Sequence, residues 1–144
     1  KLERYREAVP HLVWLARRYP GNLDYWHSVG ATLSEAGADL DFIIARRSPE
    51  KPGTGVVFVT PLRGDAETEA ASAVGFNVSS SLHSLRIEGA NEAGIATRLT
   101  QMLGAAGVNL RGLSAAVIGT QFVMHLALDT REESEKAARI LRDA

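Results

Sequence analysis

The stretch that most constrains the fold is residues 91–109, where a polar loop leads into a helix, a glycine and the start of a strand. A weaker copy ends at residues 33–40, again with a glycine, Gly37, between the helix and the strand. Glycine ends helices because it takes the left-handed conformation at no steric cost. One helix face of the later copy is apolar, with Ile95, Leu99, Met102, Leu103 and Ala106 at helical spacing.

Period-two alternation and capping residues extend this pattern through the second half of the chain. Leu85 and Ile87 alternate with polar residues and predict a strand with one wet face. Thr130 and Glu133 have the spacing of a capping box and predict a helix from there to the end. The predicted order is strand 82–88, helix 95–106, strand 110–118, strand 121–128 and a last helix.

The first half has the same order from Ala36 onward. Asp65 is expected to cap the second helix of this half. The serines 79–81 are expected to join the two halves. The predicted elements are strand 40–45, strand 56–60, helix 66–74 and a short closing strand at 76–78.

Residues 1–36 allow two alternatives. In one, residues 11–17 form a strand, and a helix with Leu33 on its apolar face follows a loop. In the other, residues 2–18 form a helix, and Pro20 with Gly21 breaks the chain before a second helix. The second alternative resembles a tetratricopeptide repeat junction, and Ala8, Leu12, Pro20, Trp26, Gly30 and Leu33 carry that resemblance.

A strand–helix–strand repeated twice is the split βαβ pattern of ferredoxin-like units. We therefore predict an α+β fold with two ferredoxin-like (βαββαβ) units, each an antiparallel sheet with helices on one face. The predicted boundaries are residues 1–80 and residues 81–144. No closing strand is visible in the second unit, so one edge of its sheet is expected to need cover from elsewhere.

From Ala36 to the end, the chain resembles a tandem pair of ACT domains. The residues that carry this resemblance are 91–95, 104–110 and 34–40, and the spacing from Gly94 to Gly107 is typical of the family. Ala93 stands where the family usually has proline, and Asn91 where it has an acid. The separation between Gly21 and Gly37 is longer than usual.

The resemblance implies a regulatory protein that binds a small effector, most often an amino acid, at an interface between two units. Free N–H groups at a helix N-terminus suit a carboxylate, here those of Gly94, Ile95 and Ala96. Asn91 offers a donor and an acceptor, and Asn109 is expected to reach a ligand from the partner unit. The candidate ligand-binding residues are Asn91, Ala93, Gly94, Ile95, Asn109 and Leu110, with Gly21, Asn22 and Asp39 in the first unit.

Composition excludes several other functions. Residues 1–72 hold nine basic and ten acidic side chains and residues 73–144 seven of each, so no basic surface for nucleic acid is expected. The chain has no cysteine, no apolar run long enough to span a membrane and no signal-peptide pattern, and the cytoplasm is the expected location. The four histidines lack metal-ligand spacing, and no nucleophile–base pair is visible.

We therefore expect a non-catalytic protein without cofactor or metal. It is expected to form a homodimer or a pseudo-dimer of its two units, and to act on an unknown partner in trans. The alternative is a protein–protein interaction module that uses the N-terminal tetratricopeptide-like helices and binds no small ligand.

Overall fold

The chain divides into two compact units, and the sequence of one unit is inserted between two segments of the other. The computed structural model describes residues 4–7, 13–18, 30–47, 50, 54–78 and 82–142. The first unit comprises residues 1–8 and 81–144 and is called here the split unit. The second, residues 9–80, is called the inserted unit. This division differs from the predicted boundaries, because the N-terminal residues belong with the C-terminal half.

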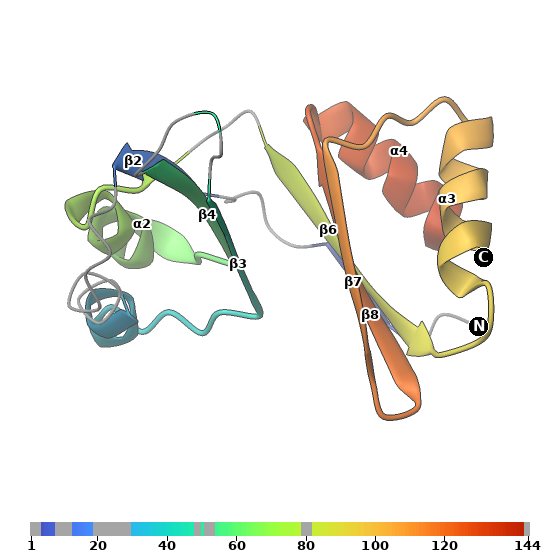
Figure 1. Ribbon diagram of the computed structural model, residues 1–144, viewed down its shortest axis with the longest axis horizontal. Helices are drawn as coiled ribbons and strands as arrows, with labels where there is room; N and C mark the ends of the chain where they lie inside the picture. The colour runs from blue at the N-terminus through green and yellow to red at the C-terminus, as the bar shows by residue number, and fades with distance from the viewer. Residues whose placement is uncertain are drawn as a thin grey trace. The chain divides into compact units, whose positions relative to one another are not determined.

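The split unit is an antiparallel four-stranded sheet with two helices on one face (Figure 1). Its strands have the order β1-β6-β8-β7. β6 and β7 follow each other along the chain, but β8 lies between them in the sheet. This is the ferredoxin-like order, with β1 in the place of the closing strand. The elements are β1 (Arg4–Glu7), β6 (His83–Ala90), α3 (Ile95–Ala105), β7 (Gly112–Ile118), β8 (Gln121–Leu128) and α4 (Arg131–Arg142).

The inserted unit has the same topology, with strand order β3-β4-β2-β5. Residues 30–35 are helical and carry the buried side chain of Leu33, and Gly37 follows with a φ of 85°. The labelled elements are β2 (Val13–Arg18), β3 (Phe42–Arg47), β4 (Thr54–Thr60), α2 (Gly64–Ala73) and β5 (Asn77–Val78).

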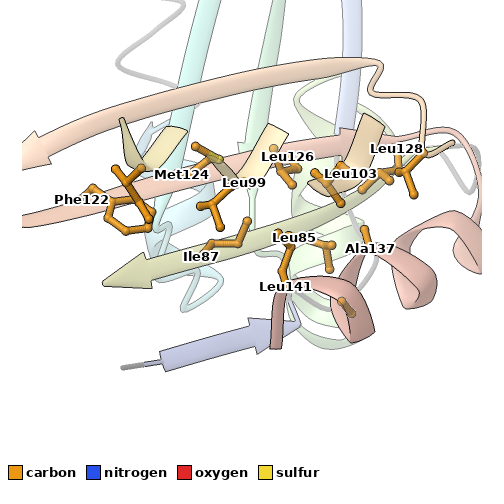
Figure 2. Close-up of a cluster of buried hydrophobic side chains, with 13 residues drawn as sticks. Leu85, Ile87, Leu99, Leu103, Phe122, Met124, Leu126, Leu128, Ala137 and Leu141 are labelled. Carbon is orange, nitrogen blue, oxygen red and sulfur yellow. The ribbon is translucent and has the colours of Figure 1, made fainter. Parts of the chain in front are cut away.

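The core of the split unit lies between its helices and one face of its sheet. Figure 2 shows Phe122 at one end of this cluster and Leu128 at the other, with Leu99 and Leu103 of α3 between them. Register explains the pattern, because Leu85 lies opposite Leu126, and alternate residues on both strands therefore face the helices. The fully buried members include Leu85, Ile87, Leu99, Met124, Leu126, Leu128 and Leu141.

The other face of this sheet carries polar and charged residues on β6 and β8. Arg86 of β6 lies opposite His125 of β8, and the Arg86 guanidinium is paired with the Glu88 carboxylate. His125 therefore faces away from the apolar stripe, as the alternation of β8 predicts. A sheet with helices on one face and polar residues on the other confirms the predicted α+β, ferredoxin-like class.

Three sequence-based expectations need correction or completion. The helical alternative for residues 2–18, and with it the tetratricopeptide resemblance, is wrong because residues 4–7 and 13–18 are strands. Asp65 does not cap α2; it lies in the first helical turn, and Arg63 is the N-cap residue. The missing closing strand of the split unit is β1, which pairs with β6 from Arg4 opposite Glu88 to Glu7 opposite Leu85.

Candidate functional site

The loop between β6 and α3 holds the best candidate site, and its backbone is fixed at both ends. The Asn91 N–H donates to the Thr120 carbonyl at 2.8 Å, which ties the loop to the turn between β7 and β8. Gly94 is the N-cap residue of α3, with a φ of 83° in the left-handed region. A Cβ added at Gly94 would meet no atom within 4 Å, so the space beside it is open.

The N-terminus of α3 has unused hydrogen-bond donors. The Ile95 N–H donates to the Glu92 carbonyl at 3.1 Å, and the Arg98 N–H to the Gly94 carbonyl at 2.9 Å. No side chain caps the helix, and the N–H groups of Ala96 and Thr97 have no acceptor among the described residues. The Ile95 N–H was predicted to be free for a ligand carboxylate, but it already donates a hydrogen bond within the turn.

The other two labelled helices have acidic residues in their first turns, and one of them also has a side-chain cap. Asp65 and Glu67 lie in the first turn of α2. In α4 the Glu133 N–H donates to the Thr130 hydroxyl at 3.1 Å, as the capping box predicts. The first turn of α3 has no acidic residue. Its partial positive charge is therefore available to an anion from outside the helix.

A surface cavity of about 540 Å³ opens beside this helix end. Its size lies within the range of about 300–1,000 Å³ common for small-molecule sites. Phe122 and Met124 of β8, both buried, form its apolar floor. Ala115, Ala116 and Val117 of β7 form the wall, and the loop residues line the opposite side.

The structure brings together only part of the predicted set. Asn91, Ala93, Gly94 and Ile95 all line the cavity. Asn109 and Leu110 do not line it: they follow α3, whose length of about 16 Å separates the two ends. Within one chain, the loop and the start of the next strand therefore do not form one site.

The expected site in the inserted unit is less complete. Asp39 is exposed, and its backbone carbonyl accepts a hydrogen bond from the Arg63 guanidinium at 3.4 Å. Gly21 and Asn22 lie outside the described residues.

Sequence reasoning missed the floor and wall of the cavity. The strands carrying Val117 and Phe122 were expected, but not their position beside the loop. The two residues lie opposite each other on β7 and β8 and share the helix-side face. Side chains of a strand alternate between the two faces of a sheet, and this rule could have indicated which residues of β7 share a face with Phe122.

Metal and membrane sites find no support in the structure. Across the described ranges, no three His, Asp or Glu side chains are grouped closely enough to hold a metal ion. None of the helices in the described ranges is both long and apolar enough to cross a membrane.

Comparisons with known proteins bear on the fold alone. No protein-family model and no curated protein matches the chain. The regulatory subunit of aspartate kinase from Thermus thermophilus, in a ligand-free form, matches with a TM-score of 0.68 at 17% identity; the match covers 100% of this chain and 99% of that chain. A protein from Bacteroides thetaiotaomicron gives a TM-score of 0.72 at 13% identity, covering 95% and 89% of the two chains.

A whole enzyme also contains this arrangement. The match to E. coli aspartokinase III, in complex with aspartate and ADP, has a TM-score of 0.59 at 12% identity and covers 92% of this chain and 31% of that chain. These neighbours support an ACT-like fold. At such low identity they carry no residue-level assignment.

Proposed function

We propose that this chain is a non-catalytic regulatory protein that binds a free amino acid in the cavity at the N-terminus of α3. The observation that carries the proposal is the uncapped helix end, with the free N–H groups of Ala96 and Thr97, beside a cavity with an apolar floor. The ligand carboxylate accepts from these two N–H groups. Its ammonium group pairs with Asn91 or Glu92 at the rim. The regulatory role is supported by neighbours that are regulatory subunits of aspartate kinase.

Amino-acid binding is expected to raise the melting temperature of the split unit. A ligand at 100 times its dissociation constant adds about 2.7 kcal/mol to the free energy of unfolding. For a unit of this size, that corresponds to roughly 10 °C or more. Far-UV circular dichroism with each of the twenty amino acids and the common nucleobases measures the effect. If no compound raises the melting temperature, ligand binding is disproved.

We further propose that a second copy of the chain covers the open side of the cavity. β7 is an edge strand without a charged residue, and its side chains Leu113, Val117 and Ile118 are 40%, 56% and 72% exposed. Long, apolar edge strands invite pairing with another strand. Two identical β7 strands can pair antiparallel about a two-fold axis, which is the commonest symmetry of homo-oligomers.

A lysine on the exposed edge tests this pairing. Ile118→Lys is expected to weaken self-association by at least tenfold, because pairing would bring the two charges into a desolvated interface. Ala105→Lys, at the C-terminal end of α3, adds the same charge at a position that favours it. Sedimentation equilibrium compares the two variants. Equal self-association in both would rule out β7 as the contact.

A further inference from the structure

The chemistry of the cavity lining restricts which amino acid can bind. The residues that would surround a ligand side chain are apolar: Phe122 and Met124 below, and Ala115, Ala116 and Val117 beside it. Phe122 is 4% exposed and Met124 fully buried, so the floor is held in place by the core. Burial of apolar ligand surface against this floor is favourable, and burial of a polar ligand group there is not.

Charge complementarity argues against an acidic or basic ligand side chain. No lysine, arginine or histidine is among the lining residues, so an acidic side chain would find no cation there. Glu92 is the single charged lining residue, and it lies at the rim with its side chain 60% exposed. Its carboxylate is already 3.5 Å from the Arg98 guanidinium. A basic ligand side chain would gain little from so exposed a carboxylate.

We infer that the cavity selects amino acids with an uncharged, aliphatic side chain, of the class of valine, leucine, isoleucine and methionine. The inference rests on the proposed function and specifies its ligand. The backbone of α3 recognises what all amino acids share, and the floor and wall of the sheet recognise the side chain. Each methylene buried against this floor tightens binding by about fourfold. Leucine therefore binds at least tenfold more tightly than alanine, and aspartate and lysine bind more weakly than leucine.

Val117→Thr separates side-chain selection from backbone recognition. Threonine has the shape of valine but replaces one methyl with a hydroxyl, and Val117 is 56% exposed, so folding is preserved. Calorimetric titration is expected to show leucine binding weakened three- to tenfold and alanine binding changed less than twofold. Val123→Thr is the matched control, because Val123 lies opposite Glu88 and does not line the cavity.

Ala115→Arg provides the converse variant. Ala115 lies opposite Met124 on the exposed edge strand and lines the cavity, so an arginine at this position supplies the cation that the cavity lacks. Binding of aspartate or glutamate is expected to appear, and binding of leucine to fall.

The outcomes distinguish this inference from the proposed function. Leucine-class binding that weakens in Val117→Thr but not in Val123→Thr supports both. Tightest binding of a charged or small polar amino acid overturns the aliphatic selection and leaves amino-acid binding intact. Unchanged leucine affinity in Val117→Thr also overturns the selection. No saturable binding of any amino acid by the unsubstituted protein overturns both.

Discussion

Ala96→Asp is expected to weaken amino-acid binding strongly while leaving the protein folded. Ala96 is exposed in the first turn of α3, and its N–H is one of the two free donors. An aspartate there places a carboxylate beside the position proposed for the ligand carboxylate. Two like charges about 5 Å apart repel by about 1–3 kcal/mol at the effective dielectric constants of a protein surface, which lowers affinity by about 5- to 150-fold.

The same substitution is expected to stabilise the free protein slightly. An acidic residue in the first turn interacts favourably with the helix dipole, by about 0.3–1 kcal/mol, and α3 has none of its own. Ala96→Asn introduces a side chain of nearly the same shape as aspartate but without its charge, and it serves as the control. Its affinity for the amino acid is expected to fall much less than that of Ala96→Asp. Calorimetry and a melting curve on both variants check the two effects. Wild-type affinity in Ala96→Asp would place the ligand elsewhere.

Removal of residues 1–7 is expected to cost the split unit about 2–5 kcal/mol. The four residues of β1 pair with β6, and each backbone hydrogen bond contributes about 0.5–1.5 kcal/mol net. Loss of β1 also leaves β6 as an unprotected sheet edge. This is a large part of the 5–15 kcal/mol that stabilises a typical domain. The urea midpoint should fall, and amide exchange should become fast at those N–H groups of residues 85–88 that point toward β1.

A strand-preserving replacement provides the control for that deletion. Changing residues 4–7 to Thr-Val-Thr-Val keeps the backbone donors in residues of high strand propensity and should retain most of the stability. Both tryptophans, Trp14 and Trp26, lie in the inserted unit, so their fluorescence follows that unit and far-UV circular dichroism follows the whole chain. An unchanged dichroism curve and unchanged exchange in β6 after the deletion would contradict the role given to β1.

Local patterns predicted the second half of the chain well. The alternation of β6 and β8 and the apolar stripe of α3 identify buried residues directly, and Leu85, Leu99 and Met124 prove to be buried. Gly107, predicted to end α3, has a φ of 69°, which other residues reach only with strain. These features depend on neighbours along the chain, so the sequence contains them without knowledge of the fold.

Long-range pairing explains what sequence reasoning missed. β1 has only four residues, including two arginines, and its partner β6 begins at His83, so no local pattern connects them. The cavity wall has the same origin. The loop at Asn91 was found from sequence, but Val117 and Phe122 come beside it only through the order of strands in the sheet.

A ¹⁵N NMR titration with leucine tests most directly whether the first turn of α3 binds the carboxylate of an amino acid. We expect saturable shifts that are largest at the Ala96 and Thr97 amides and extend to Val117 on the cavity wall. Saturable binding that leaves these amides unmoved, or no saturable shift at all, would contradict it.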